Sequence, residues 1–158
     1  MTNSTSGVLL YRATRDGFTA QAFHSKCDGK PNTITIIKNN FNFVFGGFIA
    51  ASRTDTGAWI EDPAAFIFSL RRNGVSNAEM FLVKNPKYAV DGSRGYGPIF
   101  GEDIVIRDKS NIKTGSYSDL GNKYNIEGIN TDDPKSYLAG NRNNWLTTEI
   151  EVYEIKNL

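Results

Sequence analysis

The apolar residues of this chain fall into short runs that are separated by glycine, asparagine and aspartate. In several runs apolar and polar residues alternate, as they do in a β-strand with one buried and one solvent-facing side. The pattern predicts seven strands: Val8–Ala13, Thr33–Lys38, Phe41–Ala50, Ala65–Leu70, Met80–Lys84, Asp103–Asp108 and Glu149–Ile155. Short strands with such turns predict a mostly β (α+β) fold, in which two antiparallel sheets pack as a β-sandwich flanked by a few short helices.

Finer features of the pattern give further expectations. Phe41, Phe43 and Phe45 alternate, so we expect their three rings on one face of a sheet. Residues 19–27 place apolar side chains at helical spacing and predict a helix. Residues 133–140 predict a second helix, with an aspartate cap, a proline at the first helical position and a terminal glycine. Residues 62–63, Asp-Pro, predict a single helical turn before the next strand.

Length and composition indicate one globular domain. The chain has 158 residues, of which 39% are hydrophobic, and it shows neither a long linker nor a repeat. A domain of this size can bury one substantial core. We therefore expect a single domain over residues 7–158, preceded by a flexible lead over residues 1–6.

Charge and cysteine content narrow the range of partners and compartments. The chain has 18 basic and 17 acidic residues, so its net charge gives no reason to expect nucleic acid as a partner. No apolar run is long enough for direct insertion into a membrane, and the N-terminal residues lack the pattern of a signal peptide. The single cysteine cannot form an internal disulfide. These features predict a cytoplasmic protein.

Two motifs suggest chemistry but lack the context that it needs. The run Asp55-Thr56-Gly57 matches the short motif of aspartic proteases, yet it follows polar residues instead of an apolar strand, so a surface turn is the simpler interpretation. The run GYGPIFG resembles a phosphate-binding loop, but its spacing differs and a strand follows it. A helix N-terminus would be needed to hold a phosphate, so tight glycine turns are again the simpler interpretation.

His24 and Cys27 lie three residues apart on the predicted helix, and they are the only histidine and the only cysteine. A structural zinc site needs about four ligands, so we expect no metal site and no cofactor. Cys27 stays a redox candidate, with a buried core position as the alternative. Glu149 and Glu151 could act with a metal in a carboxylate-dependent enzyme, although two carboxylates alone define no reaction.

The order of several short motifs is similar to that of a known family. The run LLYRATRDGFTAQAFHSKCDGK is followed by TITIIK, FVFGGFIA, EDPAAFIFSL, VKNPKYAV, GYGPIFG, SYSDLG, YLAG and EIEVYEI. This series resembles TLDc domains from Gly7 to Ile155, nearly the whole chain. The chain departs from the family pattern in two loops. Gly101 is followed directly by acidic residues instead of more glycines, and Ser52-Arg53 stand where an aromatic residue is common.

The resemblance implies a non-catalytic module that binds protein partners. TLDc proteins are associated with resistance to oxidative stress, and several bind the vacuolar proton-pumping ATPase and regulate its assembly. We therefore expect a protein partner, with subunits of that ATPase as the leading choice. The alternative is a redox-reactive protein or a metal- or carboxylate-dependent enzyme. Candidate binding residues lie in or beside the predicted turns and loops, where recognition often occurs: Arg12, Arg15, Asp16, Asp62, Arg94, Gly95 and Tyr96.

Overall fold

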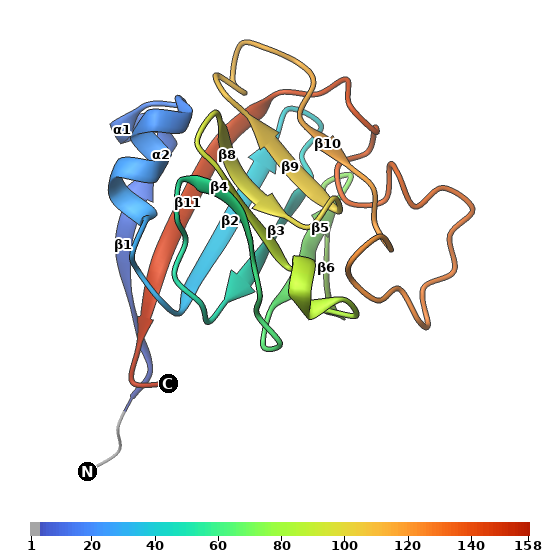
Figure 1. The fold of residues 1–158 in the computed structure, drawn as a ribbon. Coiled ribbons are helices and arrows are strands. Elements are labelled where there is room, and N and C mark those ends of the chain that lie inside the picture. The colour runs from blue at the N-terminus through green and yellow to red at the C-terminus, as the bar shows by residue number, and fades with distance from the viewer. Residues whose placement is uncertain (1–3) are drawn as a thin grey trace.

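The computed structural model describes residues 4–158 and shows two antiparallel sheets facing each other, with two helices packed at one end (Figure 1). The larger sheet contains, in spatial order, β1 (Ser6–Arg12), β11 (Thr147–Lys156), β2 (Thr33–Asn39), β3 (Val44–Ile49), β5 (Phe66–Arg72) and β6 (Val75–Leu82). The smaller sheet contains β10 (Tyr117–Ser118), β9 (Ile104–Arg107), β8 (Tyr96–Phe100), β7 (Val90–Ser93) and β4 (Thr56–Ile60). The predicted fold class is therefore confirmed.

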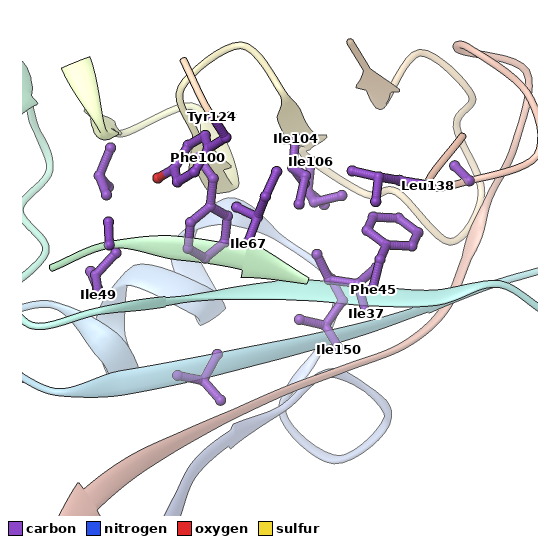
Figure 2. Close-up of a cluster of buried hydrophobic side chains, with 14 of the residues drawn as sticks. Ile37, Phe45, Ile49, Ile67, Phe100, Ile104, Ile106, Tyr124, Leu138 and Ile150 are labelled. Carbon is purple, nitrogen blue, oxygen red and sulfur yellow. The ribbon is translucent and has the colours of Figure 1, made fainter. Parts of the chain in front are cut away.

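The core lies between the two sheets (Figure 2). Phe45, Ile49 and Ile67 point from the larger sheet toward the smaller one, where Phe100 and Ile104 meet them. All five side chains are fully buried. A long segment between β9 and β11 closes one side of this core with further buried residues: Leu120, Tyr124, Tyr137, Leu138, Ala139 and Trp145.

The first and last strands are neighbours, so the two ends of the described part of the chain lie close together (Figure 1). Ser6 pairs with Lys156, and the Thr5 hydroxyl donates to the carbonyl of Asn157 at 3.4 Å. Strand β1 thus begins at the last residue of the lead expected from the sequence. Residues 1–3 of that lead lie outside the described residues, and the domain boundaries stay a prediction.

Two helices and one short 3-10 turn accompany the sheets: α1 (Ala13–Asp16), α2 (Ala20–Cys27) and η1 (Pro86–Tyr88). Helix α2 confirms the prediction for residues 19–27, and the Thr19 side chain caps it by accepting the Ala22 N–H. The helix predicted over residues 133–140 is wrong. That segment forms successive turns and buries Leu138 and Ala139 in the core. Residues 62–65 form a hydrogen-bonded turn, not a helical one.

The strand predictions need two corrections and four additions. Strand β6 spans Val75–Leu82, where Met80–Lys84 was predicted. Strand β3 begins at Val44, because Phe41 lies in a turn and Asn42 has a positive φ of 61°. The side chain of Phe41 is 42% exposed, whereas Phe45 is fully buried, so the three phenylalanines do not share one face. Strands β4, β7, β8 and β10 were not predicted. All four belong to the smaller sheet.

Candidate recognition surface

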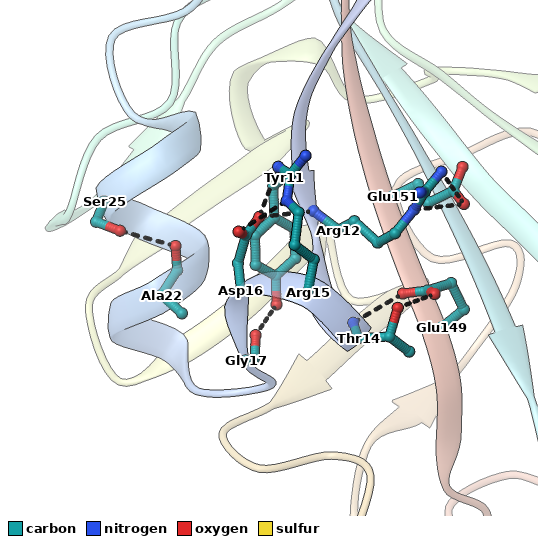
Figure 3. Close-up of polar contacts among 10 residues, drawn as sticks. All are labelled: Tyr11, Arg12, Thr14, Arg15, Asp16, Gly17, Ala22, Ser25, Glu149 and Glu151. Carbon is teal, nitrogen blue, oxygen red and sulfur yellow. Dashed lines mark hydrogen bonds and ion pairs between the residues drawn. The ribbon is translucent and has the colours of Figure 1, made fainter.

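Three of the predicted binding residues lie at the helical end of the sandwich, where β1 turns into α1 (Figure 3). Arg15 and Asp16 form a two-point ion pair, with Nε–Oδ1 and Nη2–Oδ2 distances of 2.9 Å each. Asp16 also accepts the backbone N–H of Arg12 at 3.0 Å. Asp16 therefore organises the turn, and the side chain of Arg15, 51% exposed, covers its outer side.

These contacts change the acidity of Asp16. The hydrogen bonds from Arg15 and then from the Arg12 backbone stabilise the charged carboxylate. They lower the pKa of Asp16 from 3.8 to about 2. The carboxylate is thus fully ionised at neutral pH.

Strand β11 contributes two carboxylates to the same cluster (Figure 3). Glu151 pairs with Arg12 at 3.2 Å and accepts the Tyr153 hydroxyl at 2.6 Å. Glu149 accepts the hydroxyl and the backbone N–H of Thr14, at 2.6 and 3.1 Å. The two glutamates thus bind different partners and do not converge on a common point. Within residues 4–158, no group of three or more His, Cys, Asp or Glu side chains could hold a metal ion.

The other exposed candidates form the turn between β7 and β8. Arg94 is 80% exposed and pairs with Asp55 at 3.2 Å. Gly95 completes the turn, and Tyr96, which is 43% exposed, begins strand β8. Helix α2 contacts β8 at this point. The structure therefore places Arg94–Tyr96 beside the helical end, next to α2.

His24 fixes this turn to α2. Its Nε2 lies 3.0 Å from the Ser93 carbonyl and 2.9 Å from the Tyr96 carbonyl, and its Nδ1 lies 2.9 Å from the Asp28 carboxylate. A shallow cleft of about 560 Å³ lies alongside, lined by Gln21, His24, Ser25, Asp28, Asp55 and Arg94. Because both nitrogens of His24 have partners, the ring acts as an anchor that joins two elements.

Asp62 is placed differently from the other candidates, because it is buried with only 2% of its surface exposed. Its carboxylate accepts the backbone N–H groups of Ala50, Ala51 and Ala64 at 2.6 to 3.1 Å. These bonds tie the end of β3 to the turn before β5. Asp62 therefore organises the fold and is not available to a partner.

Cys27 is fully buried on the inner side of α2. Burial is the main cause that raises the pKa of its thiol from 9.0 to about 12. A thiol that is neutral and inaccessible is a poor nucleophile and a slow target of oxidants. These are the properties of a core cysteine.

The two motifs with suggested chemistry lie in ordinary turns and strands. Asp55-Thr56-Gly57 leads into the exposed edge strand β4. The run GYGPIFG forms strand β8 and then a turn at Gly101, whose φ is 60°. Strand β9 follows, so no helix N-terminus faces the glycines. The turn interpretation thus holds only for Asp55, Gly95 and Gly101, because Thr56-Gly57 and Gly97 lie in strands.

Two buried charged residues were not singled out from the sequence. Asp103 accepts backbone N–H groups of residues 121–124, and burial raises its pKa to about 6 although these bonds oppose the rise. Arg53 is 2% exposed and lies over the rings of Phe23 and Phe100, at 5.4 and 4.8 Å. Arg53 lies in a polar loop and Asp103 stands at the start of a predicted strand, and neither position carries a signal of burial.

The fold and this surface define a β-sandwich domain whose exposed charged residues are held in place by its turns. Within residues 4–158, no helix is long and apolar enough to cross a bilayer. The family model of the TLDc domain matches residues 2–156, so the chain belongs to the TLDc domain family. A comparison with curated proteins finds no match.

Proposed function

We propose that this domain is a non-catalytic, regulatory protein-binding module of the cytoplasm. In this proposal it contributes to oxidative-stress resistance by binding the vacuolar proton-pumping ATPase and regulating its assembly. Membership in the TLDc family over residues 2–156 supports the class of function. The observation that carries the proposal is the exposure of Arg94 on a turn that His24 fixes to α2.

The geometry suits recognition because little would have to be ordered on binding. Arg15 is 51% exposed and already oriented by Asp16, and Arg94 is 80% exposed and already paired with Asp55. Preorganised side chains lose less conformational entropy when a partner binds. A domain that binds one assembly state of a complex more tightly than another shifts the equilibrium by that difference in affinity.

Co-purification of pump subunits from the native cell tests the proposal. The tagged wild-type protein should recover subunits of the vacuolar ATPase, and the Arg15→Ala/Arg94→Ala double variant should recover them at least about tenfold less, a loss of about 1.4 kcal/mol. Lys135→Ala is the matched control, because Lys135 is an exposed cation on the long segment before β11. Failure of the wild type to recover any pump subunit would refute this choice of partner.

The double variant also separates the surface from the partner. If the wild type recovers pump subunits and the double variant recovers them equally well, the partner is right and the recognition surface is wrong. In the proposed function, variants that recover fewer pump subunits should also give lower survival of cells under peroxide.

A further inference from the structure

The larger sheet has an outer face, turned away from the smaller sheet, and apolar side chains line it. Strand pairing aligns the outward residues into rows that run across the strands, because residues directly opposite each other share a face. One row contains Leu9, Tyr153, Ile34, Phe48, Phe66 and Leu82. The next row contains Arg12, Glu151, Ile36, Gly46, Phe68 and Met80. Four neighbouring strands, β2, β3, β5 and β6, are therefore apolar in both rows.

These rows enclose a groove of about 380 Å³, lined by Ile34, Ile36, Phe66, Phe68, Leu70, Ala78, Glu79 and Met80. We call it the outer groove. The carboxylate of Glu79 is already bound by the Tyr137 hydroxyl, at 2.7 and 2.8 Å. Gly46 has no side chain, and the ring of Phe68 lies over it, because a Cβ on Gly46 would be 3.0 Å from Phe68 Cζ. Met80 is 61% exposed and Leu70 is 39% exposed. The groove is thus open to solvent and apolar.

Such a face is unusual for a sheet that has one side in water, because its outward residues are normally polar. Strand β5 is apolar on both sides: Ile67 enters the core, whereas Phe66 and Phe68 face outward. Exposed apolar patches of a few hundred Å² mark interaction sites in many soluble proteins. The outer groove is therefore a candidate interaction site, with Met80 and Leu70 as its most exposed apolar residues.

Basic residues border the groove on one side. The third outward row contains Glu149, Lys38, Val44, Arg71 and Ser76. Within the described chain, Lys38 and Arg71 take part in no ion pair. Glu149, in contrast, is already bound by Thr14. The border next to β2 and β5 therefore favours an acidic partner.

The size of the apolar area decides the kind of partner. Strands lie about 4.8 Å apart and same-face residues about 7 Å apart, so four strands and two rows cover about 15 Å by 7 Å, or on the order of 200 Å² with their side chains. A stable dimer buries about 800 Å² on each partner. A second copy of the chain would thus find too little area here. A helix of about three turns is about 15 Å long and covers the area fully.

We propose that the outer groove binds an amphipathic helix of a partner protein. The helix places apolar residues at i, i+3, i+4 and i+7 in the groove, and acidic residues on its flank face Lys38 and Arg71. This surface lies on a sheet face, apart from Arg15 and Arg94, and the proposal does not depend on the vacuolar ATPase as partner.

A displayed library of amphipathic helices tests the proposal. The library varies the residues on both flanks of an apolar stripe and is selected on the wild-type domain. We expect enriched sequences with apolar residues at the stated spacing and with glutamate or aspartate on one flank. A labelled peptide of an enriched sequence should bind wild type at micromolar Kd. No enrichment of helical sequences would overturn the proposal.

Matched variants locate the binding site of that peptide. Met80→Glu should weaken binding at least about tenfold, because a charge would be placed in the groove. Val75→Glu is the control, because Val75 lies on the same strand and is 68% exposed, but it does not line the groove. Lys38→Glu should weaken binding of the acidic peptide and leave a version with glutamines on the flank unchanged. Circular dichroism shows whether each variant is folded.

Two outcomes would refute the site. One is an enriched peptide that binds Met80→Glu as well as it binds wild type. The other is dimerisation of the wild type in sedimentation that Met80→Glu abolishes, which would assign the groove to a second copy of the chain.

Discussion

At the scale of single residues, the adjacent positions 46 and 47 require glycine for different structural reasons, Gly46 for one and Gly47 for another. They lie on β3 and point to opposite faces of the larger sheet. A Cβ on Gly46 would lie 1.8 Å from the carbonyl oxygen of Thr35 on β2. A Cβ on Gly47 would lie 2.4 Å from the ring of Phe100 in the smaller sheet. The first glycine allows strand pairing, and the second allows the two sheets to approach.

We predict that Gly47→Ala lowers the free energy of unfolding by about 1–3 kcal/mol, the usual cost of overpacking a core. Phe100 is fully buried and has no space to move away. Gly7→Ala is the control, because its Cβ would meet only ordinary contacts, at 3.6 Å from Tyr153. Urea denaturation of the three proteins checks the prediction. Equal midpoints would show that the sheets can separate locally at no cost.

Asp16 gives the second residue-scale prediction, which concerns pH. Its pKa is about 2 in the folded state and about 3.8 in the unfolded state. A carboxyl group whose pKa is lowered by folding stabilises the fold above its unfolded pKa, and this contribution disappears as the pH falls from about 4 to 2. Arg15 is half exposed, so solvent screening limits the contribution to about 1 kcal/mol.

Asp16→Asn should therefore be less stable than wild type at pH 5 and nearly as stable at about pH 2. Urea denaturation across this range measures the difference. Asp132→Asn, which changes an exposed aspartate in the long segment before β11, is the control and should follow the wild type at each pH. A difference for Asp16→Asn that does not change with pH would show that Asp16 acts through its shape and not through its charge.

At the scale of elements, the sequence predicts the larger sheet well and the smaller sheet poorly. All six strands of the larger sheet were expected, but in the smaller sheet only β9 was. Strand β8 contains Gly97 and Pro98, residues that indicate turns, and β4 is exposed along most of its length. In β8 four consecutive residues are buried, so apolar and polar positions do not alternate along it. Local alternation therefore carries no signal of them.

The prediction of a helix over residues 133–140 was wrong because packing against the rest of the fold outweighs the local signals. Its end signals are real: Pro134 and Gly140 lie in turns, and Gly140 has a φ of 82°. Burial of Leu138 and Ala139 against the sheets outweighs a single turn of helix, which is only marginally stable alone. The candidate site shows the same limit of local sequence signals. Exposed loop residues such as Arg94 could be predicted, but the burial of Asp62 could not.

Helix α2 depends on His24 for its position, and this gives an element-scale prediction. His24→Ala removes the ring that joins the carbonyls of Ser93 and Tyr96 to α2. Partly buried carbonyls without a partner cost about 1–3 kcal/mol. We expect faster hydrogen exchange in α2 and in the β7–β8 turn, while the amides of β2 stay protected.

Gln21→Ala is the control for His24→Ala, because Gln21 is exposed on the same helix. It should leave exchange in the β7–β8 turn unchanged. Equal exchange rates in His24→Ala and wild type would show that apolar packing alone positions α2, for which Phe23 is the leading residue.

At the scale of the whole molecule, the first and last strands pair in the larger sheet, and the two sheets enclose one core. The reactivity of a core residue therefore reports on opening of the fold. Cys27 is such a residue, since it is fully buried. A buried thiol reacts in proportion to the population of open states, and this population rises about tenfold for each 1.4 kcal/mol of stability lost.

We predict that an alkylating reagent labels Cys27 in the native protein at least about 100-fold more slowly than in urea-unfolded protein. Gly47→Ala and His24→Ala should both accelerate labelling. For the same loss of global stability, His24→Ala should accelerate it more, because this substitution loosens the helix that carries the thiol. Mass spectrometry of the alkylated protein over time measures each rate. Native wild type that reacts as fast as the unfolded chain would require an accessible thiolate, which neither the burial nor the raised pKa of Cys27 allows. That result would favour a redox-reactive protein over a binding module.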